Sequence, residues 1–233
     1  MSLRVEQLSA GYGSIGVLRD ISFTVEKGEV LGVLGRNGMG KTTLIRALAG
    51  TIPPSQGSIF LEGEEISKLP DYQRARRGIT TVVQGRGMFP KLTVRENLEM
   101  GRIAGGRAKR NRRDEVLSYF PRLAERMNQL AGTMSGGEQQ MLAIGRGLMT
   151  DPTVMLLDEP SDGIMPTLVR QIAETLAKIN RAEGMTIIIV EQNVPMVFSM
   201  ADRCIILEKG RIVAGGSKDE IAQSNLMKEY LAI

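Results

Sequence analysis

The sequence predicts an α/β fold around a mainly parallel sheet, and three observations lead to this prediction. Segments with the composition of strands alternate with segments of helical periodicity along most of the chain. Several predicted strands, at 30–34, 154–157 and 186–190, are uniformly apolar, which is typical of parallel strands buried on both faces. Glycine accounts for 27 of 233 residues without a collagen-like period, so glycines are expected at turns and where backbone approaches a ligand.

An antiparallel region is expected beside this sheet, beginning at the start of the chain. Leu3, Val5 and Gln7 alternate with other residues, which predicts a strand with these three on one face and Leu8 on the other. A cleaner alternation follows at residues 21–25. The remaining predicted strands are short and lie at 58–61, 64–66, 79–83, 205–207 and 211–214.

Helices are predicted between and after these strands. The middle of the chain, from about residue 85 to 149, is predicted to be a mostly helical insertion. Its basic run at 107–113 is interpreted as a solvated helical face rather than a lipid or nucleic-acid surface. A further helix is expected at 167–181, and the tail from Lys218 is also helical. Residues 1–233 are therefore expected to form one domain that contains a helical subdomain at about 85–149.

The composition excludes several classes of site. Histidine is absent, which removes a Ser-His-Asp triad, a histidine base and every His-ligated metal site. Cys204 is the single cysteine, so there is no internal disulfide, and we expect a buried thiol in a reducing compartment. The net charge of +4 suits an anionic ligand, while 4% aromatic residues argue against a stacking platform for single-stranded nucleic acid. No apolar run approaches the roughly 20 residues of a membrane span, and the N-terminus lacks the apolar core of a signal peptide. The fourteen methionines are interpreted as core residues.

A complete phosphate-binding motif follows the strand at 30–34. Residues 35–42 match G-x-x-x-x-G-K-[ST], and a helix is predicted at 41–49, ending at Gly50. Glycines let backbone N–H groups turn toward a phosphate, Lys41 adds a full positive charge, and the hydroxyl of Thr42 suits Mg²⁺. The alternative is a glycine-rich turn with a solvated lysine. Such a turn would not need the complete motif between a buried strand and a helix. The expected nucleotide contacts are Gly35, Asn37, Gly38, Gly40, Lys41, Thr42 and Thr43.

A pair of carboxylates ends the predicted strand at 154–157. Asp158 is expected to hold Mg²⁺ through water, and Glu159 is the natural general base for an attacking water. Many strands end in solvated acids, so this pair is weak evidence alone. Paired with the phosphate loop, it predicts the second half of a nucleotide site.

A third motif lies at residues 135–138. Ser135 and Glu138 have the spacing of a capping box, so one interpretation is simply a well-capped helix. Gly136 and Gly137 are not needed for a cap, but they would let a phosphate approach a bare helix N-terminus. One nucleotide site does not need a second such helix end. Two facing subunits would need it, if each lent this end to the ATP of the other.

These motifs resemble those of the ATP-binding cassette (ABC) ATPases, whose signature is LSGGQ. The resemblance covers nearly the whole chain, and Ser135 lies 23 residues before Asp158, which in turn lies 34 residues before Gln192. It implies a P-loop NTPase cassette fold and contacts from Ser135, Gly136 and Gly137 to the γ-phosphate held by the opposite subunit.

The resemblance also assigns roles to isolated residues. It implies that Tyr12 stacks on adenine, although a plain surface tyrosine is the alternative. It implies that Gln84 contacts Mg²⁺ and the attacking water, although a polar residue at a strand end is the alternative. Thr42, Gln84 and Asp158 are thus the expected metal-binding residues, with ATP and Mg²⁺ as the expected ligands.

Two positions depart from the family pattern. Gln192 stands where the family usually places a histidine against the γ-phosphate; its amide can hydrogen-bond an oxygen but cannot carry a charge. Ile164 stands where the family usually has an aspartate, in the loop that signals across the two subunits. With Glu159 and Gln84, Gln192 is expected to take part in hydrolysis.

One branch of the family shares several of these local patterns. Residues 191–193, 134–140, 84–86 and 92–98 resemble the smaller ATPase subunit of bacterial branched-chain amino acid importers, with relatives for urea and short amides. The resemblance implies a second ABC ATPase (identical or different), permease subunits and, indirectly, a periplasmic binding protein as partners. It implies a peripheral position at the cytoplasmic face of the inner membrane.

Two other functions remain as alternatives. A soluble ABC protein acting on nucleic acid typically has two cassettes or a long coiled-coil insertion, whereas this chain has one phosphate loop and no room for one. No nucleic-acid partner is therefore expected. A kinase or GTPase would not explain the motif that begins at Ser135.

Overall fold

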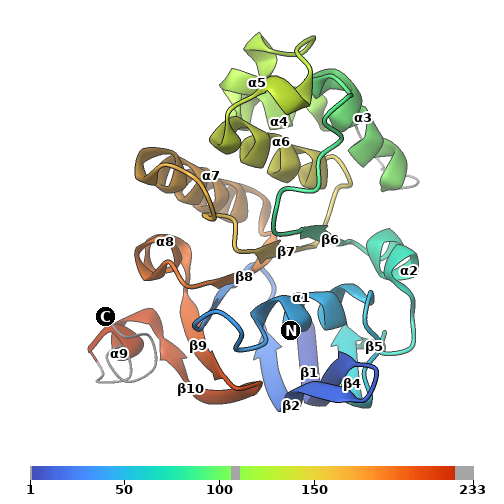
Figure 1. Ribbon diagram of the computed structural model, residues 1–233, viewed down its shortest axis with the longest axis vertical. Helices are drawn as coiled ribbons and strands as arrows, with labels where there is room; N and C mark the ends of the chain where they lie inside the picture. The colour runs from blue at the N-terminus through green and yellow to red at the C-terminus, as the bar shows by residue number, and fades with distance from the viewer. Residues whose placement is uncertain (1, 106–110, 224–233) are drawn as a thin grey trace.

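The computed structural model describes residues 2–105 and 111–223, which form two sheets and a set of helices (Figure 1). The larger sheet has six strands in the order β10-β9-β3-β8-β7-β6, of which β10 is antiparallel to β9 and the other neighbours are parallel. This confirms the predicted α/β fold with a mainly parallel sheet. The strands are β3 (Val30–Leu34), β6 (Ile79–Val82), β7 (Val154–Asp158), β8 (Thr186–Glu191), β9 (Arg203–Glu208) and β10 (Arg211–Ser217).

The smaller sheet is antiparallel, in the order β2-β1-β4-β5. Its strands are β1 (Leu3–Tyr12), β2 (Ile15–Val25), β4 (Gln56–Leu61) and β5 (Glu64–Glu65). It lies at the bottom of Figure 1, across α1 (Lys41–Ala49) from the larger sheet. The expected antiparallel region is therefore confirmed.

The phase expected for the first strand is wrong at its centre. Leu8 is buried with Leu3 and Val5, whereas Gln7 is exposed, because β1 bulges there and its register shifts against both β2 and β4. Gln7 has φ 47, and its N–H donates to the side-chain hydroxyl of Ser22 on β2 at 2.8 Å instead of to a backbone carbonyl of a neighbouring strand. A bulge moves every later side chain to the other face, so strict alternation fails beyond it.

Helices fill the chain between the strands. Between β6 and β7 the described chain is helical except for its connecting loops, as the pattern at 85–149 predicts, and these helices stand at the top of Figure 1. The described helices are α1 (Lys41–Ala49), α2 (Asp71–Arg76), α3 (Val94–Ala104), α4 (Arg113–Tyr119), α5 (Pro121–Glu125), the 3-10 turn Ala131–Thr133, α6 (Gly136–Leu148), α7 (Pro166–Glu183), α8 (Val194–Met200) and α9 (Lys218–Gln223).

The basic run only partly matches its interpretation. Its residues 107–110 lie outside the described part of the chain. Arg112, however, is 1% exposed and forms ion pairs with Glu115, Asp151 and Glu183. A solvated face is therefore wrong for Arg112, which is held in the fold by three carboxylates.

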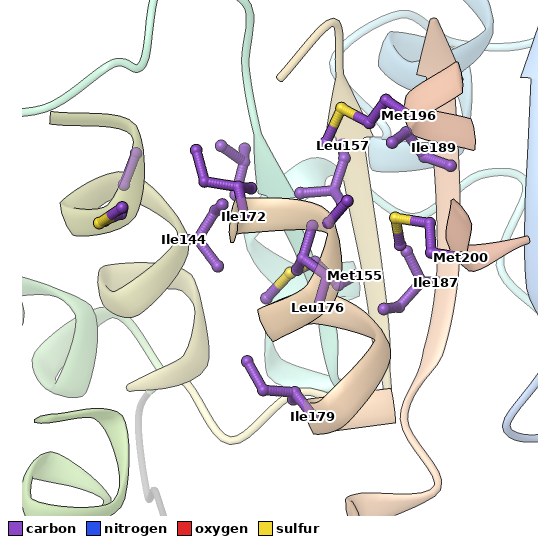
Figure 2. Packing of buried hydrophobic residues seen from close by; sticks show 14 of the residues in the cluster. Ile144, Met155, Leu157, Ile172, Leu176, Ile179, Ile187, Ile189, Met196 and Met200 are labelled. Carbon is purple, nitrogen blue, oxygen red and sulfur yellow. The ribbon is translucent and has the colours of Figure 1, made fainter. Parts of the chain in front are cut away.

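The larger sheet separates two hydrophobic cores. Alternate residues of its central strands enter opposite cores: Met155 and Ile187 lie on the side of α6, α7 and α8, and Leu156 and Ile188 on the side of α1. Figure 2 shows the first core, where side chains from β7 and β8 meet those of α6, α7 and α8. The uniformly apolar strands are thus buried on both faces, as predicted.

The two cores differ in composition. No buried methionine of the described chain lies in the core against α1. All of them lie in the core on the α6 side: Met134, Met141, Met149, Met155, Met185, Met196 and Met200. Cys204 is also buried in the methionine-containing core, as expected, and burial raises the pKa of its thiol to about 12. No described helix has both the length and the apolar character of a membrane span.

Candidate nucleotide-binding site

The glycine loop between β3 and α1 forms the base of the site. Gly38 and Gly40 have φ 79 and 105, a region that favours glycine, and no side chain caps the first turn of α1. The N–H groups at that helix end are therefore free of a capping side chain, which suits an anion. Lys41, at 3% exposed, donates to the carbonyls of Gly35 at 2.7 Å and Arg36 at 2.9 Å, so its ammonium lies inside the curled loop.

The end of β7 brings a carboxylate next to the first turn of α1. The Thr42 hydroxyl donates to Asp158 Oδ1 at 3.1 Å, which joins the two predicted metal-binding residues. Asp158 is 3% exposed, and its desolvation raises the pKa of the carboxyl to about 6. A cation at this position would stabilise the charged form that burial disfavours.

Glu159 joins the phosphate loop to the loop after β6. Its Oε1 pairs with Lys41 Nζ at 2.9 Å, and its Oε2 accepts from Gln84 Nε2 at 3.2 Å. Gln84 also donates to Asp162 Oδ2 at 3.3 Å. Glu159 has φ 46, an unfavourable backbone angle of the kind that accumulates at functional sites. Thus Glu159 is in direct contact with both Lys41 and Gln84, and all three residues were predicted separately from the sequence.

A cavity of about 300 Å³ lies over this cluster. Eight of the predicted residues line it together with Val17 of β2, which the sequence did not indicate. The predicted residues are Asn37, Gly38, Gly40, Lys41, Thr42, Thr43, Gln84 and Glu159. The cavity is therefore a place where donors of the phosphate loop and the Glu159 carboxylate face the same space.

Tyr12 lies outside this lining, at the end of β1. Its side chain is 43% exposed, its hydroxyl accepts a hydrogen bond from Arg46 of α1 at 3.1 Å, and the guanidinium lies 6.0 Å from the ring centroid. The arginine places the ring beside α1 and leaves part of it accessible to a planar ligand.

The residues at 135–137 lie at the N-terminus of α6. The predicted capping box is present: the Ser135 hydroxyl accepts from the Glu138 N–H, and Glu138 Oε2 accepts from the Ser135 N–H at 3.0 Å. The two glycines also have a packing role that the sequence did not reveal. A Cβ on Gly137 would collide with Leu168, and one on Gly136 would lie 2.8 Å from Arg86 Nη2. These three predicted residues do not line the cavity over the phosphate loop.

Gln192 follows β8 at the carboxyl edge of the sheet. Its side chain is exposed and makes no hydrogen bond with another described residue, while its backbone N–H donates to Glu191 Oε2 at 3.1 Å. Its neighbour Glu191 pairs in register with Leu34, which directly precedes the phosphate loop. The topology thus places Gln192 at the same sheet edge as Asp158 and Lys41.

Three polar residues near the site were missed by sequence reasoning. Asp162 contacts Gln84, Glu191 is buried behind Gln192, and Arg86 donates to Gln139 of α6 at 2.9 Å. All three lie within three residues of predicted site residues, which is the one signal that could have found them. Ile164 packs partly buried against the methionine-containing core, so its side chain has a structural place in the loop after β7.

Comparison with known proteins gives a consistent result. A family model described as ABC transporter matches residues 18–162. BraG of Pseudomonas aeruginosa, a high-affinity branched-chain amino acid transport ATP-binding protein, is 48% identical over 212 residues, 91% of each chain. LivF of Archaeoglobus fulgidus, a probable branched-chain amino acid transport ATP-binding protein, is 35% identical over 95% of this chain and 94% of its own. A solved nucleotide-free ATP-binding cassette from an ABC transporter has a TM-score of 0.89 at 27% identity, covering 100% of this chain and 98% of that one.

Proposed function

The chain belongs to the ABC transporter family as an ATP-binding ATPase, and we propose that it powers a bacterial importer for branched-chain amino acids. The observation that supports this substrate class best is the 48% identity to BraG along 91% of both chains. The alternative substrates are urea and short amides, which the transport experiment below separates. Substrate recognition itself is assigned to other chains of the importer.

The proposed ATP site uses the phosphate loop. Lys41 and the free N–H groups of the first turn of α1 bind the β- and γ-phosphates, and Gly35, Gly40 and Thr43 shape the loop around them. Tyr12 stacks on the adenine ring.

The proposed Mg²⁺ site uses Thr42, Gln84 and Asp158. Their hydroxyl, amide and carboxylate oxygens are the hard donors that Mg²⁺ prefers, and the raised pKa of Asp158 shows a buried carboxyl that a cation would favour in its charged form. The described residues contain no group of three acidic, histidine or cysteine side chains arranged for a metal. Phosphate oxygens and water would complete the coordination. Bound there, Mg²⁺ would neutralise charge on the phosphates.

Hydrolysis is assigned to Glu159 as general base. It takes a proton from water while the water oxygen bonds to the γ-phosphorus and the bond from that phosphorus to the bridging oxygen breaks, which releases ADP and phosphate. Gln84 is hydrogen-bonded to Glu159 and orients the same water. Gln192 donates its amide N–H to a γ-phosphate oxygen from the neighbouring loop.

The signature residues are assigned to a facing cassette. Ser135 is exposed, and Ser135, Gly136 and Gly137 lie at the end of α6 rather than in the lining of the cavity over Lys41. We propose that they bind the γ-phosphate held by a second ATPase subunit, either a second copy or a different chain. ATP then closes the pair and hydrolysis reopens it.

The permease subunits are proposed to contact the region around Gln84. A second cavity of about 410 Å³ extends from Asp158 and Gln84 to α2, and the exposed side chains of Tyr72 and Val83 line it. Such apolar exposure supports an interaction with another protein. We infer a peripheral subunit at the cytoplasmic face of the inner membrane, with a periplasmic binding protein as an indirect partner.

The first test measures the mass of Glu159→Gln in solution by light scattering, with and without ATP. Dimerisation that depends on ATP would support two facing copies. A monomer that binds ATP would overturn the homodimer, and the facing surface would then belong to a sibling ATPase. A chain that fails to bind ATP would overturn the assigned site.

The second test measures transport in cells whose genomic copy carries Lys41→Ala. Uptake of radiolabelled leucine should fall to background, while uptake of urea should be unchanged. The reverse result would contradict the amino acid assignment. An unchanged uptake of both would contradict an import role for either substrate class.

A further inference from the structure

Glu191 is a buried carboxylate to which the proposed mechanism gives no task. It is the last residue of β8 and is 1% exposed. Its Oε1 accepts the Ser161 N–H at 2.8 Å, while its Oε2 accepts the N–H groups of Gln192 and Asn193, each at 3.1 Å. The two oxygens therefore hold two different loops, one after β7 and one after β8.

Backbone dipoles, rather than a cation, satisfy this carboxylate. No lysine or arginine of the described chain forms an ion pair with Glu191, although three N–H groups point at it. Burial raises the pKa of Glu191, and the hydrogen bonds from Ser161, Asn193 and Gln192 oppose that rise. Removing such a partner leaves buried N–H groups unsatisfied, which is costly. Because losing Glu191 would be costly, its carboxylate fixes the position of the two loops that donate these N–H groups.

The loops that it holds carry the proposed reaction. Ser161 lies between Glu159 and Asp162, which both accept hydrogen bonds from Gln84. Gln192 is the residue proposed to contact the γ-phosphate. The backbone carbonyl of Glu191 also accepts the N–H of Gly35 at 3.3 Å, at the start of the phosphate loop.

We propose that Glu191 is a positioning residue that couples Gln192 to the loop containing Glu159 and Asp162. This inference rests on the proposed function, because it acts through the role of Gln192 there. One buried carboxylate accepts hydrogen bonds from both loops, so a shift of the Gln192 backbone is transmitted to the hydrogen bond from Ser161. The departure from histidine at position 192 is thus accompanied by a carboxylate that fixes the backbone of the glutamine.

The test compares Glu191→Gln with the unaltered chain. A glutamine can present one acceptor oxygen, but its amide N–H₂ must then face the N–H groups of one loop. We expect kcat for ATP to fall by up to about tenfold, no more than for loss of the Gln192 amide itself, with KM changed less than about threefold. The matched control is Asp202→Asn. In the native chain the Asp202 carboxylate accepts the Val30 N–H at 2.8 Å, at the opposite end of the sheet, so this substitution should leave kcat unchanged.

A double-mutant cycle separates positioning from a general structural role. If Glu191 acts through Gln192, the loss of kcat in Glu191→Gln combined with Gln192→Ala should be close to that of Gln192→Ala alone. Additive losses, or a native kcat in Glu191→Gln, would overturn the coupling.

Hydrogen exchange provides a readout that does not depend on hydrolysis. In Glu191→Gln, amide exchange should accelerate at Ser161 or at Gln192 and Asn193, with Leu156 unchanged. Unchanged exchange at both loops would refute the inference even in a preparation without ATPase activity, whereas an inactive unaltered chain would refute only the proposed function. If Glu191→Gln does not fold, Glu191→Asp keeps the charge but is too short to span both loops, and the same acceleration is expected.

Discussion

Lys41 and Glu159 are each other's ion-pair partners: the ammonium lies 2.9 Å from a carboxylate oxygen, and the two side chains are 3% and 10% exposed. The residue proposed to bind phosphate and the residue proposed to activate water therefore neutralise each other. A nucleotide must compete with Glu159 for Lys41, and that competition would release the carboxylate to the water.

Replacing Glu159 with glutamine tests both roles of this pair. Hydrolysis should slow by at least about 100-fold, because the amide cannot take a proton from water. ATP should bind at least as tightly as to the native chain, because Lys41 loses a competing anion. Steady-state ATPase assays and nucleotide titration calorimetry measure the two effects. The exposed carboxylate Glu174 supplies the control, since Glu174→Gln should change neither quantity; near-normal turnover in Glu159→Gln would exclude it as the base.

Gln192 is expected to contribute more to hydrolysis than to binding. In Gln192→Ala the γ-phosphate loses one amide donor that acts mainly as charge develops, so kcat should fall by about tenfold while the ATP dissociation constant changes little. Single-turnover hydrolysis and equilibrium binding distinguish these quantities. Gln171→Ala, at an exposed position on α7, is the matched control. Equal losses of binding and rate would place Gln192 in ground-state binding only.

The carboxyl of Asp158 should make the chain less stable as pH rises when no ligand is bound. Its pKa is raised from 3.8 to about 6 in the folded protein, so the folded state binds the proton more tightly than the unfolded state. This group's contribution to the free energy of unfolding is therefore lost as pH rises between these values. At about pH 7.5, the free energy of unfolding of Asp158→Asn should be about 2 kcal/mol higher than that of the native chain.

The advantage of Asp158→Asn should disappear near about pH 4, where the native carboxyl is protonated in the folded state. Chemical denaturation without nucleotide or Mg²⁺, repeated across this pH range, measures the difference. A gap that does not vary with pH would show that the asparagine acts through packing rather than through the charge.

Arg74 is expected to be important for stability although it lies outside the nucleotide cavity. It is 1% exposed and donates to the carbonyls of Ala47, Leu48, Ser67 and Leu69, and desolvation lowers the pKa of its guanidinium to about 10. Arg74→Met would leave these carbonyls without their donor, so the free energy of unfolding should fall by about 3 kcal/mol or more. Urea denaturation checks this, with the exposed Arg76→Met on the same helix as control; similar small losses in both would contradict the role.

Local patterns predicted much of the fold because each depends on neighbours in the sequence. The apolar strand before Gly35 and the capping box of Ser135 and Glu138 need only a few residues, and the structure confirms both. The phase of β1 could not be predicted from alternation. Its bulge at Gln7 depends on Ser22 and on Gly57, whose Cβ position would collide with the Gln7 carbonyl, and these lie 15 and 50 residues away.

The candidate site divides in the same way. Lys41 and Glu159 were predicted because each belongs to a recognisable motif that follows a strand. Glu191 was not, because its role depends on Ser161, which lies 30 residues earlier and is brought against it only by the fold. Arg112 was misjudged for a similar reason, since Glu183 reaches it only through the fold.

The uneven distribution of methionine between the two cores has a consequence for oxidative ageing. Conversion to the sulfoxide makes a flexible apolar side chain polar, and on the described chain every buried target lies on the side of the sheet that packs against α6, α7 and α8. Peroxide damage would therefore loosen the attachment of the signature helix while the packing of α1 against the sheet kept its aliphatic side chains. Oxidation of these buried methionines would leave the aliphatic packing of α1 intact and disturb the orientation of the half proposed to face a partner, so enzymatic reduction of their sulfoxides would restore pairing.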